Sequence, residues 1–301
     1  MNFDAENVMS KLIIIYNYLV NLWIPLFLFF AVYIYFKCLR PYKSEFTDKY
    51  FKGIPSELNV VEISNLISRK IGPNTLAAYV VGLINRKILA IGVDEAGVEY
   101  IVRGIYEGNL SIGDEATVKL ILNTMGDGDK VTIEQLHNFC KTKRNRNIML
   151  MEFQIWSKVM RKENYKHIFY ETKEEYGYVR LFAIVGCTLF LFDLFAKINN
   201  ILSYVILVTS IGLFIAFSNI YKRTRQANEE YCKWMAFKAY LEELENFEEE
   251  VLYPEEYVMY GVCLGVKGLE RKITKHNYTE RLTEALNATI MKAIVSGNRS
   301  I

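Results

Sequence analysis

Residues 12–36 read LIIIYNYLVNLWIPLFLFFAVYIYF and contain no charged side chain over 25 residues. About 20 apolar residues in a helix already cross the roughly 30 Å hydrocarbon core of a bilayer. Acidic residues precede this run, and the sequence FKCLRPYK at its end offers no small-residue cleavage site, unlike a secretory signal peptide. The run is therefore predicted to be an uncleaved transmembrane anchor, preceded by a short extracytoplasmic N-terminus at residues 1–11.

Two further apolar runs are YVRLFAIVGCTLFLFDLFA at 178–196 and ILSYVILVTSIGLFIAFSN at 201–219, with only four residues between them. So short a link predicts a hairpin of two antiparallel helices. Basic residues follow the first and the third runs, namely Lys37, Arg40 and Lys43, and Lys222, Arg223 and Arg225. By the positive-inside rule both of these ends are cytoplasmic, which places the N-terminus outside and the C-terminus inside.

Three polar side chains interrupt the apolar runs toward their predicted outer ends: Asn17, Asn21 and Asp193. A carboxylate inside a membrane segment can mark an ion or proton path. The structural alternative is that Asp193 pairs with Lys197, four residues further on, while the asparagines form hydrogen bonds between helices. The sequence favours the structural alternative, because a transporter normally needs more spans.

The composition argues against nucleic-acid binding through bulk charge, and the motif content offers no support for an enzyme. A net charge of +2 argues against a protein that holds nucleic acid by an overall positive field. The five cysteines form no CxxC pair, and the three histidines lie far apart, so neither disulfides nor a metal site is predicted. No hydrolase, phosphate-loop or dinucleotide-binding motif is present. No catalytic residue and no cofactor are therefore assigned.

Between the first and second apolar runs the pattern becomes globular. Apolar residues recur at helical spacing around residues 60–67, and a second helix is expected at 74–86 after a Gly-Pro turn. Two β-prone runs follow, at 88–93 and 98–102. Helix, helix and hairpin is the order of a winged-helix unit. Two further domains are therefore predicted, a winged-helix-like α+β domain at 41–110 and a helical extension at 111–177.

A winged helix can bind DNA by placing its second helix in the major groove. Here that helix reads NTLAAYVVGLINR and carries no row of side chains suited to reading base edges. Use of the fold for packing or protein contact is favoured, since a fold does not fix function. Nucleic acid is accordingly not the expected partner.

Two clusters of opposite charge lie in the predicted cytoplasmic part. The basic cluster consists of Lys141, Lys143, Arg144 and Arg146, and the acidic cluster of Glu242, Glu243, Glu245, Glu248 and Glu249. The basic cluster is either a patch for nucleic acid or anionic lipid, or a solvated helix end. The opposite charges predict contact between the clusters or with a partner. An exposed pair contributes at most about 1 kcal/mol, so only a network of pairs would matter.

The C-terminal region carries a recognisable motif. It reads W-x-x-F-K-x-Y-L-E-x-L and then YPEEYVMYGVCLGV, and includes Trp234, Phe237, Tyr257, Gly261 and Gly265. It resembles the tail of the YciQ-like predicted bacterial membrane proteins, the family labelled domain of unknown function 2207. The resemblance implies a bacterial cytoplasmic-membrane protein and supplies no catalytic residue. Members of that family usually carry a large extracytoplasmic β-rich domain before the first span. This chain is expected to lack that domain.

The sequence as a whole predicts a mainly α protein with three transmembrane helices, an anchor and a hairpin, together with the winged-helix-like domain and a C-terminal helical region at 222–301. The expected function is a non-enzymatic scaffold or regulator that presents a cytoplasmic protein-binding module. The alternatives are a membrane-tethered winged-helix DNA-binding regulator and small-ion transport by an oligomer, the latter resting on Asp193. The expected partners are the lipid bilayer and a protein, and a homo-oligomer is compatible with the sequence.

Overall fold

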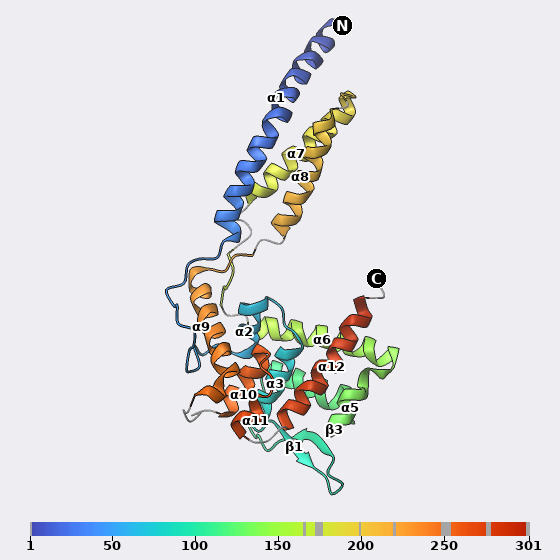
Figure 1. The fold of residues 1–301 in the computed structure, drawn as a ribbon. Helices are drawn as coiled ribbons and strands as arrows, with labels where there is room; N and C mark the ends of the chain where they lie inside the picture. Colours follow the sequence, from blue (N-terminus) through green and yellow to red (C-terminus); the bar gives the residue numbers. More distant parts are fainter. Residues whose placement is uncertain are drawn as a thin grey trace. The chain divides into compact units, whose positions relative to one another are not determined.

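The computed structural model describes residues 2–164, 167–171, 177–198, 200–218, 221–247, 254–274 and 278–298. It divides into two units. The bundle unit consists of Met1–Lys43 and Phe169–Asn228, and the polar unit of Ser44–Ile168 and Glu229–Ile301. The described part is mainly helical with one small sheet, which confirms the predicted fold class at this level (Figure 1).

The bundle unit contains three long helices in its described part: α1 (Asn2–Ile34), α7 (Gly177–Ala196) and α8 (Ile201–Ser218). A π-helical turn, η1 (Tyr35–Leu39), follows α1. By length and composition α1 and α7 are long and apolar enough to cross a membrane, whereas the apolar part of α8, Ile201–Ile215, is shorter. Two of the three predicted spans are thus supported, and the third is a helix at the predicted position.

Main-chain hydrogen bonds join the two ends of the α7–α8 hairpin. The N–H of Glu171 donates to the carbonyl of Lys222 at 2.9 Å, and the N–H of Thr224 donates to the carbonyl of Phe169 at 3.0 Å. These bonds surround an antiparallel bridge between Tyr170 and Arg223. The chain therefore enters α7 and leaves α8 at the same place.

Small and polar side chains form part of the interior of the bundle unit, beside Tyr16 and Trp23 of α1. The buried residues of α7 and α8 are Val179, Ala183, Gly186, Asp193, Ser203, Ile206, Ser210 and Leu213. Large apolar side chains on the same helices are exposed, among them Leu181, Leu191, Phe195, Val208 and Phe214. Close packing through small residues, with bulky apolar groups outside, is typical of helices that face lipid.

Trp23 of α1 packs against both α7 and α8. Its ring stacks on Phe182 with centroids 4.4 Å apart, and its Nε1–H donates to the hydroxyl of Thr209 at 3.1 Å. A Cβ added to Gly186 would lie 2.0 Å from the Ser210 hydroxyl oxygen and 2.5 Å from the Trp23 ring. Only a glycine therefore fits at position 186 without displacing its neighbours.

The polar unit has more and shorter elements. Its first segment contains α2 (Val60–Ser68), α3 (Pro73–Asn85), β1 (Leu89–Val93), β2 (Glu99–Arg103), α4 (Ile112–Val118), η2 (Lys119–Thr124), β3 (Lys130–Thr132), α5 (Ile133–Asn138), η3 (Phe139–Lys141) and α6 (Lys143–Asn164). The second segment contains most of α9 (Arg225–Glu242), then η5 (Leu244–Asn246), α10 (Pro254–Leu264), α11 (Leu269–Thr274) and α12 (Tyr278–Asn298). Both predicted helices and both predicted strands of residues 60–102 are present.

Local sequence signals explain where these helices begin. Asn59 caps α2 by accepting the N–H groups of Val61 and Glu62 at 3.0 Å, while the Glu62 carboxylate accepts the N–H of Asn59. Ser111 and Thr132 cap α4 and α5 in the same reciprocal manner. Such capping boxes satisfy backbone donors that the first turn of a helix leaves without partners.

The sheet is antiparallel with strand order β1-β2-β3, and Ile101 of β2 lies opposite Val131 of β3. The third strand thus comes from the segment predicted as a separate helical extension. The winged-helix prediction is not confirmed. The order helix, helix, hairpin is present, but α3 packs against α10 and α12 and buries seven of its 13 residues. It is a core helix with no free face for a DNA groove.

The family motif forms part of this core. Trp234 and Phe237 of α9 are fully buried, and Phe237 meets Tyr257 of α10 edge to face at 5.2 Å. A Cβ on Gly261 would lie 2.3 Å from a Leu269 methyl carbon, and Gly265 ends α10 with a left-handed φ of 76°. These contacts pack the helices of the second segment against one another, and the Trp234 Nε1–H donates to the Ser56 hydroxyl of the first segment at 3.2 Å.

Candidate functional site

Asp193 lies in the interior of the bundle unit with 1% of its surface exposed. Its carboxylate accepts hydrogen bonds from the hydroxyl of Tyr16 at 2.9 Å, the hydroxyl of Ser203 at 3.1 Å and the N–H of Asn200 at 3.1 Å. One side chain thereby ties α1, α7 and α8 together near the hairpin turn.

The predicted pairing of Asp193 with Lys197 is wrong. Contact between residues four apart requires a continuous helix, but α7 ends at Ala196 and Lys197 has a left-handed φ of 50°. Lys197 is exposed, and the described residues contain no ion pair between the two. The asparagines of α1 are exposed as well, and Asn21 bonds to the carbonyl of Asn17 within its own helix rather than to another one.

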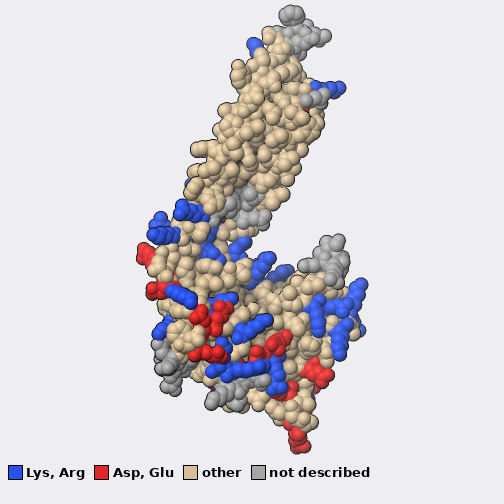
Figure 2. All heavy atoms as spheres, viewed as in Figure 1, with Lys and Arg blue, Asp and Glu red and all other residues tan. Residues whose placement is uncertain are grey.

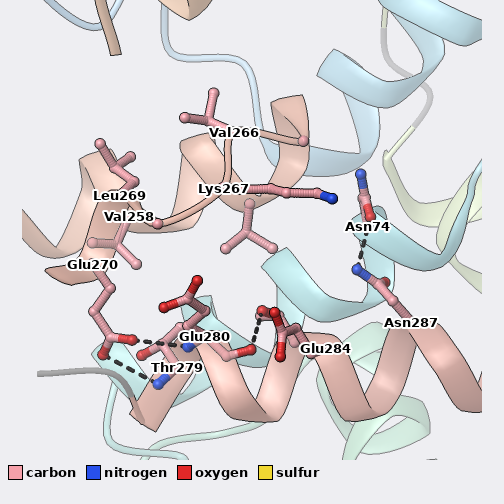
Figure 3. A pocket seen from close by; sticks show the side chains of 14 residues that line it. Asn74, Val258, Val266, Lys267, Leu269, Glu270, Thr279, Glu280, Glu284 and Asn287 are labelled. Carbon is pink, nitrogen blue, oxygen red and sulfur yellow. Dashed lines mark hydrogen bonds between the residues drawn. The ribbon is translucent and has the colours of Figure 1, made fainter. Parts of the chain in front are cut away.

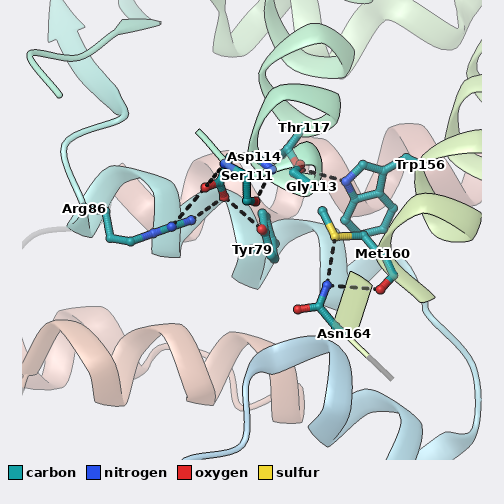
Figure 4. A network of polar contacts seen from close by, with 9 residues as sticks. All are labelled: Tyr79, Arg86, Ser111, Gly113, Asp114, Thr117, Trp156, Met160 and Asn164. Atoms are coloured by element: carbon teal, nitrogen blue, oxygen red, sulfur yellow. Dashed lines mark hydrogen bonds and ion pairs between the residues drawn. The ribbon is translucent and has the colours of Figure 1, made fainter. Parts of the chain in front are cut away.

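A polar network joins α3 to α4 in the polar unit (Figure 4). Asp114 receives two hydrogen bonds from the Arg86 guanidinium, at 2.5 and 3.1 Å, and one from the Tyr79 hydroxyl at 2.8 Å. Burial alone would raise the pKa of Asp114, but the Arg86 and Tyr79 hydrogen bonds and the Arg86 charge outweigh it and lower that pKa. Burial and the nearby Asp114 charge raise the pKa of Tyr79. The polar groups of Asp114, Arg86 and Tyr79 are thus all engaged in contacts that join α3 to α4.

A cavity of about 290 Å³ lies beside the loop that connects α10 to α11 (Figure 3). Two of the glutamates that line it, Glu270 and Glu280, make structural contacts. Glu270 accepts the N–H groups of Thr279 and Glu280 at 3.1 and 2.8 Å and so caps the start of α12, and Glu280 pairs with Arg271 at 2.8 Å. The Asn287 amide donates to the Asn74 side chain at 2.9 Å. The first set of contacts fixes the start of α12 against α11, and the Asn287–Asn74 bond joins the middle of α12 to α3.

The two charge clusters have separate partners within the described residues. Glu242 pairs with Lys238, Glu245 with Lys272, and Glu243 with Lys49 and the Tyr50 hydroxyl. The hydrogen bonds from Tyr50 and Lys49 lower the pKa of Glu243. Glu248 and Glu249 lie outside the described residues. No ion pair joins the described acidic residues to the basic cluster, so the predicted contact within one chain is not seen there.

The basic cluster divides into two pairs. Lys143 and Arg146 line a cavity of about 710 Å³ between the start of α6 and the end of α12, whereas Lys141 and Arg144 are exposed and lie outside its lining. Lys292 of α12 joins the first pair, and Cys140, Ala288, Met291 and Val295 supply an apolar wall. Figure 2 shows Lys and Arg side chains gathered on this side of the unit, where α12 ends.

Sequence reasoning missed Lys292 because it lies far along the chain from the basic cluster. A signal was present, since Ala288, Met291 and Val295 recur at helical spacing and Lys292 interrupts the face they form. Tyr16 and Ser203 were missed for the same reason, because nothing local to Asp193 indicates which helices surround it.

Two thiols of the polar unit, Cys140 and Cys263, are in environments that disfavour the thiolate. Burial raises the pKa of Cys263 to about 11, against a small opposing effect from Ser64. Burial also raises the pKa of Cys140, although the Arg146 and Lys292 charges oppose it. A nucleophilic cysteine needs a lowered pKa, so both behave as packing residues.

Comparison with known families agrees with this architecture. A family model described as the C-terminal domain of a predicted membrane protein matches residues 47–268, which include α2 to α10 and the α7–α8 hairpin. The chain therefore belongs to a class of predicted membrane proteins. Its family is DUF2207, as the C-terminal motif indicated. No curated protein and no solved structure matches the chain.

Proposed function

We propose that this protein is a non-enzymatic membrane scaffold. In this proposal α1, α7 and α8 all span the bilayer, and the polar unit is held on the cytoplasmic side, where it binds a protein partner. A bacterial cytoplasmic membrane is the location implied by the family resemblance.

One observation carries this topology. The polar unit is built from the segment before the α7–α8 hairpin and the segment after it. Two segments that fold into one unit must lie on the same side of a membrane, so the chain between them crosses an even number of times. If α7 crosses, α8 must cross as well. With 18 residues at 1.5 Å each, α8 is about 27 Å long, close to the thickness of the hydrocarbon core.

The charges at the helix ends support a cytoplasmic position for the polar unit. Lys222, just after α8, donates to the carbonyl of Lys37 at 2.6 Å, and its ammonium lies 3.9 Å from the Tyr42 ring centre. Basic residues from the ends of α1 and α8 thus gather at one end of the bundle unit. Lysine and arginine concentrate on the cytoplasmic side of membrane helices, and aromatic rings lie at the same interface.

A binding role is favoured over an enzymatic one because the buried polar side chains already make structural contacts. Asp114, Glu270 and Glu243 each hold donors that fix a helix or a neighbouring segment, and the buried thiols are kept protonated. The DNA-binding alternative loses support because α3 lies in the core. The ion-transport alternative loses support because neutral donors occupy the Asp193 carboxylate.

Lysine cross-linking in intact membranes, followed by mass spectrometry, tests the scaffold role. We expect cross-links from lysines of the polar unit to one other protein. Lys11, before the apolar run of α1, is the matched control and should give none to that protein. Cross-links confined to this chain would contradict the proposal.

A further inference from the structure

We propose that the cavity between α6 and α12 binds the phosphate group of an organic phosphate. Three cationic side chains from two helices line it, Lys143 and Arg146 from α6 and Lys292 from α12. No aspartate or glutamate is among its lining residues. Three like charges around one hollow repel one another, and an anion placed between them converts that repulsion into attraction.

The cations of the cavity are available to a ligand. Neither Lys143 nor Lys292 forms an ion pair within the described residues. Arg146 uses one terminal nitrogen to donate to the carbonyl of Lys141 at 3.1 Å, which fixes the guanidinium in place. Its Nε–H is buried and has no acceptor in the described part of the chain. Because that Nε–H is closed to solvent, an anion would bind the second terminal nitrogen of this preorganised guanidinium, which makes no hydrogen bond to a described residue.

The position of the cavity favours phosphate over a single carboxylate. Lys143, Arg146 and Asn147 belong to the first turns of α6, a helix of 22 residues. The start of a helix carries partial positive charge and backbone N–H groups that suit phosphate oxygens. Here this effect adds to three full charges that surround the same space.

The size and the apolar wall indicate an ester rather than a free ion. A volume of about 710 Å³ far exceeds one phosphate group. Met291 and Val295 are about half exposed and face the remaining space together with Ala288. The phosphate would lie against the cations and the organic part against this wall. Both a phospholipid headgroup and a soluble phosphate ester have this chemistry.

Phosphorus NMR on the full-length chain in neutral detergent tests the site. The probes are inorganic phosphate, glycerol 1-phosphate and dihexanoylphosphatidylglycerol, and binding is read from line broadening. We expect the double variant Lys143→Gln/Lys292→Gln to weaken binding of the tightest probe by at least about tenfold, since each charge-assisted hydrogen bond contributes strongly. The melting temperature should stay unchanged, because neither lysine forms an ion pair with a described residue.

The matched control is Lys141→Gln/Arg144→Gln, which removes the same net charge from the same cluster but outside the cavity. It should change the affinity by less than about twofold, allowing for screened long-range attraction. Equal weakening by both double variants would show diffuse attraction and overturn the proposal. Tighter binding of a glutamate-rich peptide than of any phosphate probe would also overturn it.

The probes distinguish the two sources. Tightest binding of the phosphatidylglycerol probe assigns the cavity to a lipid headgroup. Equal or tighter binding of glycerol 1-phosphate assigns it to a soluble ester. Each result supports the phosphate site, and failure of all three probes to broaden contradicts it.

Discussion

Both units bury aromatic side chains, Trp234 and Phe237 in the polar unit and Tyr16 and Trp23 in the bundle unit, but the bundle unit also packs Gly186 and Ser210 inside and leaves Phe195 outside. The difference reflects the surroundings of each unit. Water drives large apolar groups inward, so the polar unit has an aromatic core. Lipid is as apolar as leucine, so helices within it associate through close packing and hydrogen bonds instead.

The largest expected effect uses one substitution in both units. Phe237→Ala should destabilise the polar unit by about 3–5 kcal/mol, because it leaves a cavity in a packed core. Phe195→Ala, at a position 85% exposed, should change stability by less than about 0.5 kcal/mol. Thermal unfolding in detergent measures both. Similar losses for the two variants would mean that Phe195 is a core residue. They would contradict a bundle unit whose large apolar side chains face outward.

An arginine on the outer surface of each unit sharpens the comparison. Val208→Arg on α8 should cost about 2.5–3.5 kcal/mol, the penalty for a charge at the centre of a membrane helix. Ile105→Arg, at a position of the polar unit that is even more exposed, should be close to neutral in water. The measurement is the fraction of protein that resists alkaline extraction from membranes. Tolerance of both arginines would contradict a lipid-facing α8.

Close packing in the bundle unit can be tested with two glycines. Gly186→Leu should destabilise by about 1–3 kcal/mol, because its Cβ meets Ser210 and the Trp23 ring. Gly212→Leu is the control, since nothing lies within 4 Å of the Cβ position there. The difference in melting temperature between the two variants is the readout, and equal melting temperatures would exclude tight contact at position 186.

The two units also hold their buried carboxylates differently. Asp114 of the polar unit faces Arg86, whereas Asp193 of the bundle unit faces neutral donors. Asp114→Asn should cost about 1–2 kcal/mol at neutral pH, less than for a fully buried pair because Arg86 is half exposed.

The pH dependence of this effect has a definite sign. The folded state lowers the pKa of Asp114, so its contribution is present above the ordinary carboxyl pKa of about 4 and is lost as the pH falls through the folded value. The difference between wild type and Asp114→Asn in chemical unfolding should therefore shrink in acid. A difference that stays constant from neutral pH into acid would contradict the role given to Arg86.

Features set by neighbouring residues could be predicted from the sequence. The apolar runs, the helix starts at Asn59 and Thr132, and the β1–β2 hairpin all follow from local periodicity and capping. Contacts between distant segments could not be predicted in this way. Three such features depend on how the segments pack: the burial of α3 under α10 and α12, the third strand of the sheet, and the position of Lys292 beside Arg146. The Lys197 pairing failed because the helix ends one residue too early.

The most direct test of the account places reporters on both sides of the hairpin. Fusions after Lys43, within the turn at 197–200 and after Ile301 should read inside, outside and inside. That order requires α7 and α8 to cross together, as a polar unit built from two segments demands. A reporter in the turn that reads the same side as the other two would contradict it.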